Sequence, residues 1–452
     1  GDTLFWQGVQ LYLETHAHGI VETNDLQRAL EKVSGHSLER FFDQWVYRPG
    51  HPELQVKISY EDGWCSVALK QTQKVAETAL FELELEVEVL SKDHELTRHR
   101  KRISSVHDAL VFSLPQRPAY VAFDPELRVV GSIQVEAPGD MLRRQLRQGS
   151  SARIRAMAAD TLAKKSDPTT IAVLRESLAD PAEAWMVRAE AARALGKTRA
   201  SAALDVLIEL SSTQHPKVRR AVVQALGLFR NDRALAALRP LSKNDPSYLV
   251  EAEVARSMGK TRQKSALAPL LAMLDRSSWG DIVRMGALDG LAALRDEGAL
   301  TPVLERTRYG HSIRTRRAAL GALAELGEGK RVREHLESLL DDGNPLVRAE
   351  VASSLLAFGD VRSRGAVRRA AERELDGRVA RKLRETLRDL GGPSQDKKRV
   401  ADELENVRGE LAELKARFAK LEAKAEATSK APRAAATTAP ALTERPRRKG
   451  RK

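Results

Sequence analysis

The sequence predicts a multidomain, mainly α-helical protein in which a small antiparallel β-sandwich precedes an α-solenoid. Three observations predict this fold class: apolar spacing changes from helical to alternating near residue 51, a motif recurs about every 32 residues, and a heptad pattern follows residue 393. They divide the chain into a helical segment 1–50, a β-sandwich 51–137, a superhelix 138–392, a coiled coil 393–427 and a disordered basic tail 428–452.

Length and charge narrow the function classes. The 452 residues allow about two to four domains, and the single cysteine, Cys65, excludes an intrachain disulfide. The net charge of +13 is concentrated in residues 428–452, which carry eight Lys/Arg and one acid, so the other 427 residues carry +6 (13 minus 7). The folded body is therefore close to balanced, and its basic pI does not indicate a nucleic-acid-binding protein.

No membrane or secretion signal is visible. The longest apolar run, Ala266 to Leu274, has nine residues with a proline inside, far below a membrane span. No basic segment followed by an apolar core opens the chain. We therefore expect no membrane span and a cytoplasmic location.

The first region reads as three short helices. Leu4, Phe5, Val9, Tyr12 and Leu13 recur at helical spacing, and Thr23 and Ser37 are candidate caps of two further helices. Nothing else in residues 1–50 is large enough to cover the first helix. We therefore expect that further polypeptide precedes Gly1.

Seven alternating runs follow and predict the sandwich. In one run Glu82, Glu84, Glu86 and Glu88 share a face, and the next run offers Arg98, Arg100 and Arg102 with the same period. Cross-strand ion pairs on a solvated face fit better than a calcium or acid/base site, because the carboxylates are collinear rather than convergent. The Lys101 side chain would then point into the core, so its charged end must reach solvent at an edge of the sheet.

The internal repeat is the clearest signal in the chain. The segment "VRAEAARALG" from Val187 recurs from Val218, Val250, Val283 and Val347, with weaker copies from Ile154, Thr315 and Val379, at steps of 31 to 33 residues. Each unit predicts two antiparallel helices that bury their apolar face only by stacking on neighbours. The units resemble HEAT repeats, which implies a protein-binding surface.

One arginine recurs at a fixed position of the repeats: Arg188, Arg219, Arg284 and Arg348. Such a row can bind nucleic acid, but its fixed position favours an internal ladder with carboxylates of the turns. The twice-repeated "GKTR", from Gly196 and Gly259, follows helix ends without a phosphate-binding glycine loop and is interpreted as helix C-caps.

Residues 393–427 predict a parallel, two-stranded coiled coil that dimerises the protein. Its seam, with steps of four and three, is Val400, Leu404, Val407, Leu411, Leu414, Phe418 and Leu421. The alternative is one amphipathic helix folded back onto the last repeat. In the tail beyond it, weak and salt-dependent polyanion binding is expected from Arg445, Arg447, Arg448, Lys449, Arg451 and Lys452.

The search for catalytic chemistry finds no candidate catalytic or metal-binding residue in this chain. His94 and Glu95 begin like a His-Glu-x-x-His zinc motif, but the second histidine is His99, five positions on and turned away on a helix. The repeats contain His215, His311 and His335, in separate units and none followed by Glu.

The first 137 residues resemble the end of the catalytic domain and the following sandwich of the gluzincin zinc aminopeptidases, the membrane alanyl aminopeptidase family. The resemblance rests on Thr23, on Glu31 to Gly35, and on an aromatic and turn pattern that ends before a strand. That pattern consists of Phe41, Phe42, Trp45, Gly50 and Pro52, and Phe123 to Pro125 resemble the family's closing strands.

The resemblance implies a truncated helical end of a peptidase catalytic domain, with zinc in the parent protein and its ligands upstream of Gly1. The parent would remove N-terminal residues from a peptide substrate, while this chain binds no zinc and is inactive alone. The alternative is a non-catalytic scaffold that kept the peptidase fold and binds proteins through its HEAT surface.

Overall fold

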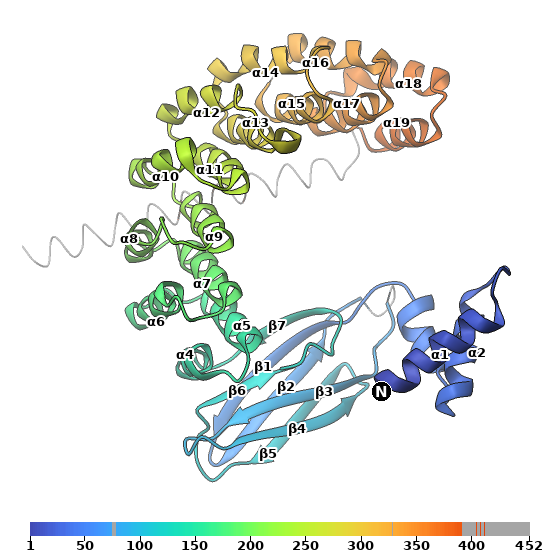
Figure 1. The fold of residues 1–452 in the computed structure, drawn as a ribbon, viewed down its shortest axis with the longest axis vertical. Coiled ribbons are helices and arrows are strands. Elements are labelled where there is room, and N and C mark those ends of the chain that lie inside the picture. Colours follow the sequence, from blue (N-terminus) through green and yellow to red (C-terminus); the bar gives the residue numbers. More distant parts are fainter. Residues whose placement is uncertain (75–77, 328, 391–403, 405–406, 408–410, 412–452) are drawn as a thin grey trace, which may run out of the picture. The chain divides into compact units, whose positions relative to one another are not determined.

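The computed structural model describes residues 1–74, 78–327 and 329–390, together with Leu404, Val407 and Leu411. It divides the chain into two compact units, Gly1–Leu390 and Gly391–Lys452. The first unit contains a helical N-terminal segment, a β-sandwich and a helical superhelix (Figure 1). The predicted fold class, a mainly α-helical multidomain chain with a small sandwich and a solenoid, is confirmed for this unit.

Three helices and a π-helical turn form the N-terminal segment: α1 (Asp2–Thr15), α2 (Thr23–Ser34), α3 (Glu39–Phe42) and η1 (Asp43–Tyr47). The predicted caps are displaced, because α2 begins with a capping box formed by Glu22 and Asp25, and α3 is preceded by Leu38 without a side-chain cap. Helices α1 and α2 cross closely at the buried Gly8, where an added Cβ would lie 2.6 Å from Leu30 Cδ2.

Seven strands form the sandwich: β1 (Glu53–Glu61), β2 (Trp64–Gln71), β3 (Leu83–Leu90), β4 (Leu96–Ile103), β5 (His107–Ser113), β6 (Tyr120–Phe123) and β7 (Ser132–Glu136). One sheet has the order β5-β2-β1-β7 and the other β4-β3-β6. The prediction of a purely antiparallel sandwich is wrong at one pair, because β7 runs parallel to β1, with Leu54 opposite Ile133. A parallel pair needs a long connection, which here crosses the other sheet.

The inner faces of the two sheets bury the alternating apolar residues that predicted the strands, among them Leu54, Val56, Leu85 and Val87. Cys65 is fully buried, and this burial raises the pKa of its thiol to about 11, so it acts as a small packed residue. Lys101 leaves the core as expected, at β5, where its Nζ lies 2.7 Å from the Asp108 carboxylate.

The charged face of β3 differs from the prediction. The cross-strand pairs form, with Glu82 bonded to Arg102, Glu86 to Arg100 at 2.5 Å and Glu88 to Arg98 at 3.4 Å. The face is not solvated throughout, however, because Glu86 and Glu88 are buried. Ser150, in the turn between the first two solenoid helices, donates to the Glu88 carboxylate at 2.9 Å and so helps to cover it.

Sixteen α-helices of the described chain form eight pairs (Figure 1). The outer helices are α4 (Gly139–Gln148), α6 (Pro168–Ala179), α8 (Ser201–Glu209), α10 (Asp232–Asn244), α12 (Leu267–Met273), α14 (Leu300–Arg306), α16 (Gly329–Ser338) and α18 (Arg364–Arg373). The inner helices are α5 (Ala152–Leu162), α7 (Trp185–Thr198), α9 (Pro216–Leu226), α11 (Tyr248–Lys260), α13 (Ile282–Leu294), α15 (Ile313–Leu326), α17 (Pro345–Phe358) and α19 (Gly377–Asp389).

Small residues let successive inner helices approach closely. An added Cβ on Gly196 would lie 2.7 Å from Ala225 Cβ, and one on Gly259 would lie 1.9 Å from the Gly290 carbonyl oxygen. The "GKTR" segments do end helices, but their glycines lie inside α7 and α11. The residues in left-handed conformation there are Arg199 and Arg262.

The solenoid starts directly on the sandwich. Leu90, Tyr120 and Ala122 of the β4-β3-β6 sheet pack with Met141 of α4 and Ile154 of α5 in a separate buried cluster. The sandwich and the first repeat therefore share a buried apolar contact. No helix of the described residues is long and apolar enough to cross a membrane.

Candidate functional site

The predicted seam and tail fall almost entirely outside the described residues. Leu404, Val407 and Leu411 are described, helical and about half exposed, at 50%, 59% and 51%. Val400, Leu414, Phe418 and Leu421, and all six tail cations from Arg445 to Lys452, lie outside the described residues. The dimer, the alternative cap and the polyanion contact stay predictions.

Among the described residues, no group of three or more His, Cys, Asp or Glu side chains could hold a metal ion. His94 lies in the turn before β4 with a positive φ of 64°, while His99 lies in β4 and stacks on Phe112 at 4.0 Å. The two imidazoles thus belong to different environments. Burial lowers the pKa of His99, which favours its neutral form.

The arginine row forms part of the predicted ladder. Arg219 and Arg348 bind carboxylates of the following turn, Asp245 at 2.6 Å and Glu374 at 2.7 Å. Arg284 instead binds Asp281 of its own turn, and Arg188 binds the Leu178 carbonyl and the Thr213 hydroxyl without a carboxylate. The repeat position also continues in two arginines that the prediction missed, with the pairs Arg155–Glu183 and Arg316–Asp342.

The N-terminal segment carries a set of exposed apolar side chains, and we call this set the apolar wall. It consists of Leu4, Phe5, Trp6, Leu13, Ile20, Val21, Phe41, Val46 and Tyr47. Trp6 is 65% exposed and stands edge-on to Phe5 at 5.2 Å. A segment that exposes this many large apolar side chains is a candidate contact surface in a folded protein.

Other residues of this segment fasten it to the sandwich. Trp45 packs on Phe81 with ring centroids 5.4 Å apart, and the Gln44 amide exchanges hydrogen bonds of 2.8 and 3.1 Å with the Glu82 backbone. Phe42 is buried while its neighbour Phe41 is exposed. The aromatic cluster therefore serves two surfaces, one against the sandwich and one in the wall.

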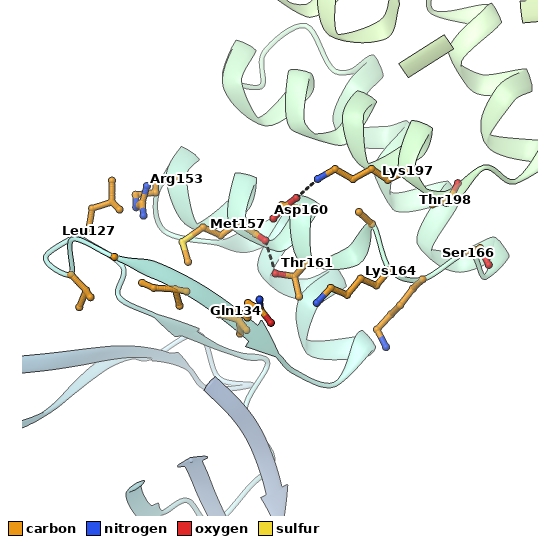
Figure 2. A pocket seen from close by; sticks show the side chains of 16 residues that line it. Leu127, Gln134, Arg153, Met157, Asp160, Thr161, Lys164, Ser166, Lys197 and Thr198 are labelled. Atoms are coloured by element: carbon orange, nitrogen blue, oxygen red, sulfur yellow. Dashed lines mark hydrogen bonds and ion pairs between the residues drawn. The ribbon is translucent and has the colours of Figure 1, made fainter. Parts of the chain in front are cut away.

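A groove lies between strand β7 and helix α5 and has a volume of about 850 Å³. Its apolar lining includes Val129, Ile133 and Met157. Figure 2 shows Gln134 of β7 below Met157 and Thr161 of α5, with Arg153 and Lys164 toward different ends. We call this space the β7–α5 groove.

Cations dominate the β7–α5 groove. Its lining includes Arg153, Lys164, Lys165 and Lys197 but only one carboxylate, Asp160, which Lys197 binds at 2.5 Å. Among the described residues no carboxylate forms a close ion pair with Arg153, Lys164 or Lys165, although the Asp124 carboxylate attracts Arg153 at longer range. The Arg153 Nε is buried and has no hydrogen-bond partner there, and this burial lowers the pKa of the guanidinium.

Sequence reasoning missed the groove. The paired lysines Lys164 and Lys165, placed between two helices, were a visible signal, but Arg153 and the edge of β7 are brought to them only by the packing of the first repeat on the sandwich. A distant strand and a helix share the groove, so no local motif could indicate it.

The fold defined by these elements is an α-solenoid that starts on a β-sandwich. The HEAT-repeat family model matches residues 139–215, 208–292, 241–324 and 299–388, more than half of the chain. The chain therefore belongs to the HEAT-repeat family.

Two relatives match this chain over a short stretch of sequence. The chain is 38% identical over 52 residues to the tricorn protease-interacting factor F2 of Thermoplasma acidophilum, a match that covers 12% of this chain and 7% of that protein. It is 33% identical over 58 residues to aminopeptidase N of Lactococcus lactis, covering 13% and 7%. The match thus spans only a small part of either relative's length.

A solved structure shares the fold over most of the chain. Legionella pneumophila aminopeptidase A, in complex with aspartic acid, matches with a TM-score of 0.57 and 14% identity, covering 86% of this chain and 54% of that one. The predicted resemblance to aminopeptidases is confirmed as a local sequence relationship and as a common fold.

Proposed function

We propose that this chain is the C-terminal part of a zinc-dependent aminopeptidase, an enzyme that removes N-terminal residues from peptides. The apolar wall carries the proposal. Burying apolar surface is favourable by about 25 cal/mol for each Å² removed from water. The exposed side chains of Phe5, Trp6 and Leu13 therefore fit an internal wall that a preceding catalytic body covers. The local similarity to aminopeptidases supports this interpretation.

In this proposal the sandwich and the HEAT repeats frame the active site. The zinc ligands come from polypeptide upstream of Gly1, because the described residues contain no group that could hold a metal. Bound zinc would activate water for attack on the peptide carbonyl. In this proposal the described part of the chain forms walls of the active site and holds them in place, and it supplies no reacting group.

The HEAT surface is proposed to bind protein as well. Aromatic side chains stand exposed at the starts of inner helices or in the turns before them, among them Trp185, Tyr248, Trp279 and Tyr309, the last 96% exposed. Two of them lie under cations of the next inner helix, Lys217 over Trp185 at 4.2 Å and Arg314 over Trp279 at 5.5 Å. Exposed tryptophan and tyrosine are typical of protein contact sites.

The test compares residues 1–452 with the longer protein encoded by the same reading frame. We expect the longer protein to bind one zinc per chain and to hydrolyse aminoacyl-coumarin substrates in a chelator-sensitive manner, while residues 1–452 do neither. A longer protein that folds but lacks zinc and activity would overturn the enzyme in favour of the scaffold. Stoichiometric zinc in residues 1–452 would contradict the placement of the ligands.

A further inference from the structure

Strand β7 presents an unpaired edge inside the β7–α5 groove. It is the terminal strand of its sheet and pairs only with β1. The Ser132 N–H donates to the Pro52 carbonyl toward β1, at 3.0 Å. Backbone groups alternate in direction along a strand, so the N–H and C=O of Ile133 and Val135 point away from β1. None of the described hydrogen bonds uses them.

The same groove offers cations at two separated places. Arg153 lies in the first turn of α5, and Lys164 and Lys165 follow its end. Eleven positions at 1.5 Å per helical residue separate Arg153 and Lys164 by about 16 Å. An extended peptide covers this distance in about five residues at 3.3 Å each.

We propose that the β7–α5 groove binds an extended acidic peptide, which adds a strand to the edge of β7. The outward groups of Ile133 and Val135 would form backbone hydrogen bonds with the peptide, as in other complexes of strand addition. Carboxylates of the peptide pair with Lys164 and Lys165 near one end and with Arg153 near the other. The apolar lining residues receive the side chains that alternate with the acidic ones.

The charge of the β7–α5 groove favours an acidic peptide as its ligand. The lining carries four cations and one carboxylate, a balance of +3, and the Arg153 Nε is buried without a partner. Guanidinium groups stay charged, so a carboxylate of the ligand would add to the attraction that Asp124 already exerts on Arg153. A single-stranded nucleic acid also offers negative charge, but it has no backbone amide to pair with the open edge.

The binding test uses the full chain and a fluorescein-labelled octapeptide of alternating glutamate and threonine, followed by fluorescence anisotropy in about 150 mM salt, the physiological ionic strength. We expect saturable binding that Lys164→Glu with Lys165→Glu weakens by about tenfold or more, since charge-assisted hydrogen bonds are lost. The exposed pair Lys243→Glu with Lys264→Glu is the matched charge control and leaves the affinity within about twofold. Absence of binding at millimolar peptide would overturn the proposal.

Strand addition is tested separately from charge. Val135→Pro removes an outward N–H and spares the ladder to β1, because proline is tolerated where the N–H points out of a sheet edge. It should weaken the peptide about fivefold or more without changing the affinity for tripolyphosphate. On the unmodified protein, an octapeptide N-methylated at alternate residues keeps the charge but should lose affinity similarly.

Two results would contradict strand addition. If the N-methylated peptide binds as well as the parent peptide, the groove recognises charge alone. If a single-stranded oligonucleotide competes more tightly than the peptide and loses affinity in the Lys164→Glu, Lys165→Glu variant, the occupant is a nucleic acid. The basic tail carries the same charge in every comparison, so it cannot create either difference.

Discussion

The Tyr120 hydroxyl donates a 2.9 Å hydrogen bond to the Glu88 carboxylate, and both side chains are fully buried where the sandwich meets the first repeat. The Ser150 hydroxyl, in the turn before α5, donates to the other Glu88 oxygen at 2.9 Å. Burial and the neighbouring carboxylate raise the pKa of Tyr120, so it stays a donor at any physiological pH. Since the Ser150 N–H also donates to the Tyr120 hydroxyl at 3.3 Å, Ser150 joins the turn before α5 to both residues of the sheet.

Tyr120→Phe should therefore destabilise the protein by about 1–3 kcal/mol, because it removes a donor from a buried carboxylate without changing the packing volume. Urea unfolding followed by circular dichroism measures the change. Tyr309→Phe, at a fully exposed phenol, is the control and should leave the free energy of unfolding within about 0.5 kcal/mol. Equal effects of the two variants would show that the Tyr120 bond does not stabilise the joint.

The ladder pair Arg219–Asp245 should be far more sensitive than a surface pair. Its side chains are 8% and 1% exposed, so Arg219→Met leaves a buried carboxylate uncompensated and should cost about 3–5 kcal/mol. The matched variant Arg233→Met breaks an exposed pair with Asp205 and should cost less than about 1 kcal/mol. Similar losses in both variants would contradict an internal role for the ladder.

The close approach of α11 and α13 predicts opposite effects of two glycine substitutions. Gly259→Ala places a Cβ against the Gly290 carbonyl, backbone that cannot move aside, and should lower the melting temperature. Gly321→Ala, inside α15 with no atom near its added Cβ, should stabilise the helix by up to about 1 kcal/mol. Calorimetry on both variants checks the signs, and a stable Gly259→Ala would refute the tight crossing.

His335 should make stability depend on pH. Its Nε2 lies 2.8 Å from the Thr307 hydroxyl, which itself donates to the Leu304 carbonyl, so the imidazole donates here. Burial, followed by Arg308 and Arg331, lowers its pKa below the ordinary 6.5. The folded state then binds fewer protons than the unfolded state, so this contribution is present above pH 6.5 and is lost as the pH falls through the folded pKa.

Urea midpoints between pH 7.5 and 5 measure this effect. His335→Gln should be less stable than the parent protein near pH 7.5, and its stability should fall less on acidification. His36→Gln, at an exposed imidazole, controls for the loss of one histidine from the sequence. A parent protein and His335→Gln variant with parallel pH profiles would contradict the assignment.

Periodicity was enough to predict most of the fold. The seven alternating runs became seven strands and the repeat became helix pairs, because both patterns report which side chains face a core. The parallel β1–β7 pair was missed since sequence spacing does not show strand order. The burial of Glu86 and Glu88 was missed because it depends on the first repeat, a separate region of the chain, covering their sheet.

The sites were less predictable. The sequence indicated the apolar wall, because nothing in residues 1–50 is large enough to cover the apolar side chains of the first helix. The β7–α5 groove could not be predicted in this way, since only tertiary packing brings its edge strand and its three cations together. Only part of the arginine ladder was predicted from the sequence. The position of Arg188 in the motif is that of Arg219, yet the turn after it offers a threonine hydroxyl where the other turn offers a carboxylate.

The most direct test of the account measures whether the apolar wall is an internal surface. Hydroxyl-radical footprinting with mass spectrometry compares residues 1–452 with the longer protein from the same reading frame. We predict that oxidation of Phe5 and Trp6 falls several-fold in the longer protein, while Trp64 and Trp279, also exposed, react equally in both. Equal oxidation of Trp6 in the two proteins would contradict a catalytic body packed on the wall.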